Sequence, residues 1–158
     1  MKRLVALAVF LVAGAVAAGV AFAGHGGGGH GGKHHGKTVY VIEHATTDAV
    51  TNNDGRATDS VGDILTFTNE VFDKKNAQKV GTDQGYCVRT VVGKSWECFW
   101  TLILKGGLIT VEGPFYDTGD SVFVVTGGSG KYAGAKGSMK LHWRDAKGTA
   151  FDFIYDLK

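Results

Sequence analysis

Apolar and polar residues alternate along most of the chain beyond residue 37, which is the period of a β-strand with one buried face. The last segment shows this best, because Phe151, Phe153 and Tyr155 alternate with Asp152 and Ile154. Eight segments rich in Val, Ile, Thr and aromatic residues share the pattern, and Gly, Asp and Asn separate them. The predicted strands are Thr38–Thr46, Asp63–Phe72, Thr82–Val92, Trp96–Leu104, Leu108–Gly113, Ser121–Thr126, Lys136–Trp143 and Thr149–Leu157.

Most of the connections between these segments are short, which favours antiparallel hairpins over crossovers through helices. Eight such strands predict an all-β fold in which one antiparallel sheet closes into a barrel, formed by a single domain over residues 38–158. Side chains fill the interior of a barrel of this size, or it holds one small ligand. The polar segment Thr47–Val61 is predicted to be a mobile rim loop. The net charge is only +2, with Lys and Arg scattered, which excludes a basic stripe for nucleic acid.

The first 23 residues have the features of a secretory signal peptide. Lys2 and Arg3 precede the apolar run from Leu4 to Phe22, and a small-x-small cleavage pattern ends at Ala23. A membrane anchor is the alternative, but no polar stop-transfer flank follows the run. We therefore expect a secreted protein without a stable membrane anchor after cleavage.

Residues 24–37 are dominated by glycine and histidine, which predicts a flexible linker between the export signal and the domain. Clustered imidazoles can also bind Zn, Cu or Ni weakly, so this segment contains the weak metal-ligand candidates, His25, His30, His34 and His35. No pattern in the chain indicates an ordered metal site or a cofactor.

The two cysteines, Cys87 and Cys98, flank a predicted hairpin turn at Val92-Gly93. A turn centred there places them opposite each other on adjacent strands, and export favours oxidation, so we predict a disulfide. In the chain-entropy model a loop this short contributes roughly 2–3 kcal/mol. A metal site or a nucleophilic thiol is the alternative, without a CxxC pattern or a paired histidine to support it.

A glycine-rich loop, Gly127-Gly128-Ser129-Gly130, follows the strand Ser121–Thr126. Glycine supplies the positive φ angles that tight turns require, so a structural turn is the first interpretation. A phosphate-binding loop is the alternative, although no Lys-Ser/Thr pair and no helix follow.

The run GPFYDTGDSVFVVTGGSGKYAGAKGSMKL, which begins at Gly113, resembles the central segment of plant allene oxide cyclases. Its GGSGKYAGAKG part also resembles dirigent proteins. The likeness extends upstream through Gly62–Asn69 and Gly85-Tyr86-Cys87, and it covers about Thr38 to Lys158. The resemblance implies a calycin-type barrel, and the trimers of the plant relatives imply a homotrimer.

The resemblance also assigns roles to individual residues. It assigns six residues to a ligand cavity, namely Leu65, Phe67, Asn69, Cys87, Trp96 and Phe115, and it makes Asn69 a candidate for holding a catalytic water. A strand-end amide that caps the next turn is the alternative role for Asn69.

Parts of the plant pattern are missing. Phe115 occupies the place of a Tyr, and the only proline is Pro114, so the Ser-Pro element is absent. The first-strand Glu of the family falls at or near Val41, with Glu43 and His44 close by but out of register.

Two classes of function remain open. In the first, the barrel binds a small apolar molecule, such as a fatty-acid derivative or a phenolic, and guides its cyclisation or coupling as an isomerase-like protein. In the second, it is a non-catalytic secreted barrel with a filled core that binds a lipid or a partner. Apolar walls alone cannot stabilise an oxyanion, so we expect no catalysis of the plant cyclisation itself.

Overall fold

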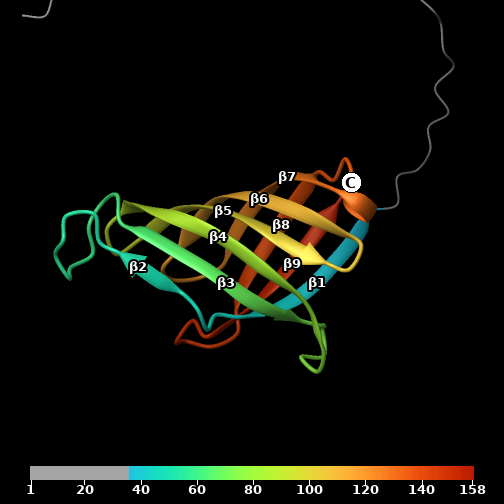
Figure 1. Ribbon diagram of the computed structural model, residues 1–158, viewed down its shortest axis with the longest axis horizontal. Helices are drawn as coiled ribbons and strands as arrows, with labels where there is room; N and C mark the ends of the chain where they lie inside the picture. Colours follow the sequence, from blue (N-terminus) through green and yellow to red (C-terminus); the bar gives the residue numbers. More distant parts are fainter. Residues whose placement is uncertain (1–35) are drawn as a thin grey trace, which may run out of the picture. The chain divides into compact units, whose positions relative to one another are not determined.

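The structure, a computed structural model, describes residues 36–158, and the predicted signal peptide and four linker histidines lie outside these residues. The described part contains nine strands and one short 3-10 turn (Figure 1). The strands are β1 (Lys37–His44), β2 (Ala49–Thr51), β3 (Ile64–Phe72), β4 (Lys79–Val91), β5 (Ser95–Leu104), β6 (Gly107–Tyr116), β7 (Ser121–Gly128), β8 (Gly137–Trp143) and β9 (Ala150–Leu157), and the turn η1 is Gly130–Tyr132. Between residues 36 and 158, no helix is long and apolar enough to cross a membrane.

The strands form one antiparallel sheet in the order β1-β9-β8-β7-β6-β5-β4-β3-β2. A further pairing between β1 and β3 closes the sheet, so the eight-stranded antiparallel barrel predicted from the alternation is confirmed. Closure removes the free edges that would otherwise expose unpaired backbone groups.

The first barrel strand is interrupted, which the sequence analysis did not predict. In its first part, β1, His44 pairs with Glu70 of β3. After a break, Ala49 of the short β2 pairs with Thr66, which lies nearer the beginning of β3. In Figure 1, β2 lies beside the beginning of β3 and away from β1. The predicted rim loop Thr47–Val61 is therefore wrong in part, because its first residues return to the sheet.

Large aromatic side chains fill much of the barrel interior. The Trp100 ring lies 4.3 Å from the ring of Phe123 and 5.4 Å from that of Phe153, measured between centroids. Gly85 lies opposite Trp100 in the neighbouring strand, where an added Cβ would come within 2.4 Å of the Trp100 Cβ. The strand needs a glycine here so that the indole can pack against its backbone.

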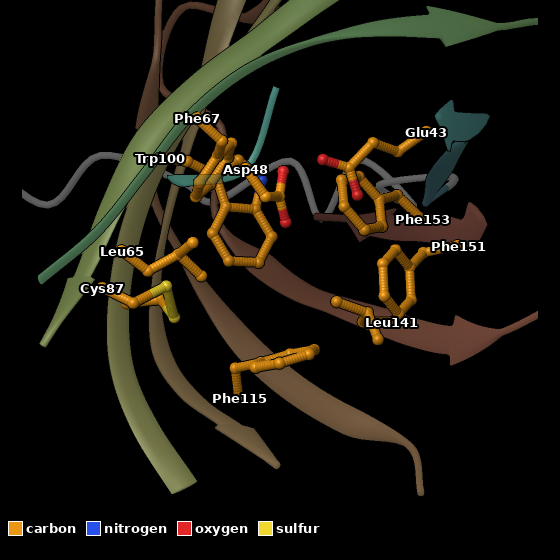
Figure 2. A pocket seen from close by; sticks show the side chains of 11 residues that line it. Glu43, Asp48, Leu65, Phe67, Cys87, Trp100, Phe115, Leu141, Phe151 and Phe153 are labelled. Atoms are coloured by element: carbon orange, nitrogen blue, oxygen red, sulfur yellow. A yellow bond between two sulfur atoms is a disulfide. The ribbon is translucent and has the colours of Figure 1, made fainter. Parts of the chain in front are cut away.

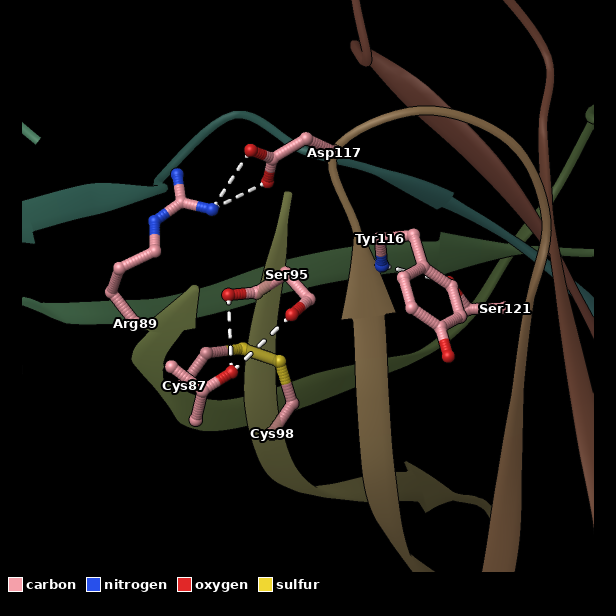
Figure 3. The surroundings of a disulfide bond; sticks show 8 residues. Cys87, Arg89, Ser95, Cys98, Tyr116, Asp117 and Ser121 are labelled. Atoms are coloured by element: carbon pink, nitrogen blue, oxygen red, sulfur yellow. Dashed lines mark hydrogen bonds and ion pairs between the residues drawn. A yellow bond between two sulfur atoms is a disulfide. The ribbon is translucent and has the colours of Figure 1, made fainter. Parts of the chain in front are cut away.

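The predicted disulfide is present between Cys87 and Cys98 (Figure 3). The two residues are direct partners in the register of β4 and β5, with their Cα atoms 4.0 Å apart. The turn between these strands contains Gly93 at a φ of 64°, which agrees with the predicted hairpin. Because both sulfurs are in the bond, neither cysteine is free to act as a nucleophile.

The glycine-rich loop is a structural turn, as the first interpretation predicted. The backbone N–H groups of Ser129 and Lys131 donate to the carbonyl oxygens of Leu108 and Gly106 in the β5–β6 hairpin. Gly130 has a φ of 58°, and a Cβ there would lie 2.2 Å from the Gly106 oxygen. Because neighbouring backbone occupies these two donors, the loop does not present them to a phosphate.

An ion-pair cluster lies where β4 ends. Buried Arg89 donates from Nη1 to both carboxylate oxygens of Asp117 at 2.7–2.8 Å (Figure 3). Its Nε donates to Asp59 at 2.7 Å. Its guanidinium also lies 3.9 Å above the ring of Trp96. Arg89 thereby ties the segment after β2 and the β6–β7 loop to the end of the barrel.

Candidate functional site

A cavity of about 50 Å³ lies inside the barrel. Its lining is mostly aromatic and aliphatic, with two carboxyl groups on one side (Figure 2). The lining residues are Glu43, Asp48, Leu65, Phe67, Cys87, Cys98, Trp100, Phe115, Leu141, Phe151 and Phe153. Asp48 is exposed and Leu65, Phe67 and Phe115 are half-buried, so the cavity communicates with the surface on this side. Its volume leaves room for a few water molecules.

Glu43 is the buried acid of this cavity, with only 5% of its surface exposed. The period of two places it on the inner face of β1 together with Val39 and Val41, which are buried as well. The family's first-strand Glu aligns at or near Val41, which suggested that this strand supplies no carboxyl group to the interior. The structure shows that the carboxyl group of Glu43 does reach the interior.

Asn69 holds the strand break and the cavity carboxyl groups together. Its Oδ1 accepts hydrogen bonds from the backbone N–H groups of Thr46 and Thr47 and from the Thr47 hydroxyl, each at 3.0 Å. Its Nδ2 donates to Oε1 of Glu43 and to Oδ1 of Asp48, each at 2.8 Å. Both amide hydrogens and the amide oxygen are thus occupied by protein groups. This favours the capping role over the water-holding role for Asn69.

Burial dominates the electrostatics of the site. It raises the pKa of Glu43 well above the ordinary value, and the nearby charge of Asp83 raises it further, while the hydrogen bond from Asn69 lowers it. Burial also raises the pKa of Asp83 to about 7. The cavity is therefore flanked by a carboxyl group that keeps its proton far above the pH at which an exposed glutamate would lose it.

Four of the six residues predicted to line the cavity do so: Leu65, Phe67, Cys87 and Phe115. Cys87 contributes as half of the disulfide and not as a thiol. Trp96 is buried beneath Arg89 and does not line the cavity, and Asn69 reaches it only through its hydrogen bonds to the two carboxyl groups.

Sequence reasoning missed the remaining lining residues. Phe151 and Phe153 could have been found, because the alternation in β9 already placed them on one face. No pattern in the sequence indicated that Asp48 lines the cavity, because it lies in the break between β1 and β2 that Asn69 holds in place. Among residues 36–158, no cluster of three or more His, Cys, Asp or Glu side chains has an arrangement that could hold a metal ion.

A closed antiparallel barrel with an aromatic interior cavity and a buried carboxyl group defines the class of interior-cavity β-barrels. Within this class, the chain belongs to the allene oxide cyclase family, whose model matches residues 35–145.

Solved structures share the fold at low sequence identity. A pyocyanin demethylase is 22% identical with a TM-score of 0.64, and the match covers 75% of this chain and 100% of that one. The pterocarpan synthase dirigent protein PsPTS1 is 11% identical with a TM-score of 0.65, over 78% and 94% of the two chains. AbnU, an exo-specific intermolecular Diels-Alderase, is 16% identical with a TM-score of 0.62, over 77% and 97%. At these identities the likeness shows the fold alone.

Proposed function

We propose that this protein binds a small, mostly apolar and unsaturated molecule inside the barrel and guides its cyclisation or coupling. The observation that carries the proposal is the carboxyl group of Glu43, which is buried in a cavity with otherwise mainly apolar walls. A carboxyl group in such surroundings is expensive to bury, and a raised pKa in a cavity is typical of functional sites.

The family and the neighbouring folds support the same kind of role. The names of the neighbours describe a dirigent pterocarpan synthase and an intermolecular Diels-Alderase, and reactions of this kind depend on the orientation of the reactants. In this chain, the rings of Phe67, Trp100 and Phe153 would restrict the conformation of a ligand. Glu43 would then interact with a ligand oxygen where charge develops.

The small volume sets a condition on this proposal. A cavity of about 50 Å³ is well below the roughly 300–1,000 Å³ of common ligand pockets. Phe115 is half-buried, and its ring packs against Trp143 and Phe151 with centroids 5.9 Å from each. A ligand larger than a few heavy atoms therefore requires this aromatic group to shift. The full plant substrate, a long fatty-acid epoxide, is expected to fit poorly.

The second candidate is a non-catalytic secreted barrel with a filled core that binds a lipid or a partner at its surface. The observation that favours it is again the small volume, because aromatic rings occupy much of the interior. Both candidates keep the expectation of export, and they differ in whether the interior opens to a ligand.

Chiral chromatography of reaction products separates the two candidates. The purified domain would be incubated with a fatty-acid allene oxide, with phenoxy radicals of a phenylpropanoid, and with a diene and dienophile pair. We expect enrichment of one enantiomer in the second or third reaction, and loss of the enrichment in Glu43→Gln. The matched control is Glu97→Gln, because Glu97 is an exposed acid of β5. Racemic products in all three reactions would reject the proposed function and favour the filled barrel.

A further inference from the structure

Asp83 is a buried acid that the proposed chemistry does not yet use. It is fully buried on β4, where it pairs with Asn69 of β3 and Leu102 of β5. Neither of its carboxylate oxygens receives a hydrogen bond from an N–H or hydroxyl group in residues 36–158. Two other buried polar groups of the interior, Nε1 of Trp100 and the hydroxyl of Tyr155, also lack a partner within this range. A buried carboxylate without a donor is costly, so Asp83 needs an explanation.

The groups around Glu43 and Asp83 limit how the two carboxyl groups can be hydrogen-bonded. Both acids flank Asn69, which is the register partner of Asp83 and donates from Nδ2 to Oε1 of Glu43 at 2.8 Å. The charge of Asp83 raises the pKa of Glu43, and the charge of Asp48 raises the pKa of both acids. Burial raises the pKa of the Tyr155 hydroxyl, and the negative charges of Asp83 and Glu43 raise it further. Within residues 36–158, no Lys or Arg forms an ion pair with either acid.

Two carboxyl groups in contact can form a hydrogen bond only when at least one of them carries a proton. Like charges held close together in a buried site cannot both persist, so such a pair keeps a proton that isolated acids would lose. Asn69 donates to Glu43 and Asp48, but no side-chain donor reaches Asp83. A proton shared with Glu43 would therefore give Asp83 a side-chain hydrogen bond that the other described residues do not provide.

We propose that Asp83 is a positioning residue that shares a proton with Glu43 at neutral pH and so makes the cavity a hydrogen-bond donor. The inference rests on the proposed function for its ligand class: an uncharged molecule with an acceptor oxygen, such as a carbonyl, an epoxide or a quinone. Glu43 donates the hydrogen bond to that oxygen and stabilises the negative charge that develops on it. The proton stays on the pair, so no covalent bond forms or breaks in this step. A ligand carboxylate is disfavoured at this end of the cavity.

Carbon-13 NMR of side-chain carboxyl groups tests the shared proton without any substrate. Protein labelled at the glutamate side-chain carboxyl carbon would be titrated from pH 4 to pH 9. The exposed acids Glu70, Glu97 and Glu112 serve as internal references. We expect Glu43 to remain protonated at pH 7 and to lose its proton at a lower pH in Asp83→Asn, because the amide removes a negative charge and can donate to Glu43. Asp156→Asn, a change at an exposed position of β9, should leave the Glu43 titration in place.

The reciprocal variant keeps the test decisive if Asp83→Asn does not fold. In Glu43→Leu with labelled aspartate, the pKa of Asp83 should rise further above its ordinary value, because burial remains and the variant removes the hydrogen bond from Glu43 that lowers this pKa. A Glu43 signal that is fully deprotonated at pH 7, or two titrations that ignore each other's variants, would overturn the shared proton.

The ligand class has its own spectroscopic readout. The carbonyl stretch of bound 2-cyclohexenone should move to lower frequency in the unmodified protein and lose that displacement in Asp83→Asn. An enone that binds with an unshifted carbonyl stretch would overturn the donor role. Failure of the chiral assay together with a confirmed titration would reject the proposed function and leave the proton sharing intact.

Discussion

Nδ2 of Asn69 donates to Oε1 of Glu43 across 2.8 Å, and this single contact joins the structural break in the first barrel strand to the acid of the cavity. The same amide satisfies the backbone N–H groups of Thr46 and Thr47, where the chain leaves β1 before β2 begins. The position of the acid therefore depends on an amide that is also needed to close the barrel.

Replacing Asn69 should destabilise the protein strongly. Asn69→Ala removes five hydrogen bonds and leaves buried donors and acceptors without partners, so the free energy of unfolding should fall by about 3 kcal/mol or more. Urea denaturation followed by circular dichroism measures this loss. Thr68→Ala, at the adjacent exposed position, is the control and should cost much less. Equal stability of the two variants would contradict the role of Asn69.

Stability should decrease as the pH rises through neutrality. Asp83 has a pKa of about 7 in the folded chain against an ordinary value of 3.8, so between these values the folded state binds more protons than the unfolded state. The free energy of unfolding therefore falls as the pH rises from about 4 to about 7. Thermal denaturation should give a higher midpoint at pH 5 than at pH 8, and Asp83→Asn should flatten this dependence. A midpoint that rises from pH 5 to pH 8 would argue against the raised pKa.

The local pattern of the sequence was sufficient for most of the fold. The period of two placed the inward faces of the barrel strands, and the symmetry about Val92-Gly93 predicted the partners Cys87 and Cys98. These features depend on neighbours in sequence or on one hairpin, which is why a single sequence contains them.

The candidate site was harder to predict because long-range closure assembles it. Glu43 was on the inward face by alternation, but comparison with the plant pattern moved attention to Val41. Asp83 showed no local signal, since its contact with Glu43 exists only after β1 pairs with β3 and β3 with β4. The hairpin symmetry that pairs Cys87 with Cys98 also pairs Arg89 with Trp96, so the sequence contained a signal for this contact that the analysis did not use.

Arg89 should control the order of the loops at the end of β4. Arg89→Met keeps much of the apolar stem but removes the ion pairs to Asp59 and Asp117, so the free energy of unfolding should fall by about 2–3 kcal/mol. Arg89→Lys should not restore it, because an ammonium cannot make the forked contacts. Hydrogen exchange should accelerate at Gly93, whose N–H donates to Asp59. Exchange unchanged in both variants would show that the loops do not depend on Arg89.

The disulfide should contribute measurably to stability. Cys87 and Cys98 are 11 residues apart, a short loop for which the chain-entropy model gives about 2–3 kcal/mol. Reduction by dithiothreitol should lower the thermal midpoint, and the Cys87→Ala/Cys98→Ala double variant should show the same midpoint with and without reductant. A midpoint that reduction does not move would mean that β4 and β5 are held by their other contacts alone.

Filling the cavity should abolish ligand binding, whereas the same change on the outside of the barrel should not. Leu65 lines the cavity, and the preceding residue, Ile64, faces outward with 42% of its surface exposed. In Leu65→Trp the indole would occupy a space of about 50 Å³, so the affinity for a small neutral enone should fall at least about tenfold, which is 1.4 kcal/mol of binding free energy. Ile64→Trp adds the same side chain to the same strand and should bind as the unmodified protein does.

Calorimetry is the suitable measurement, because the new tryptophan would disturb fluorescence. Overpacking in Leu65→Trp should itself cost about 1–3 kcal/mol of stability, so the titration would be made at a temperature where both variants are folded. Binding retained in Leu65→Trp would place the ligand outside the barrel, and binding lost in both variants would trace the effect to β3 as a whole rather than to the cavity.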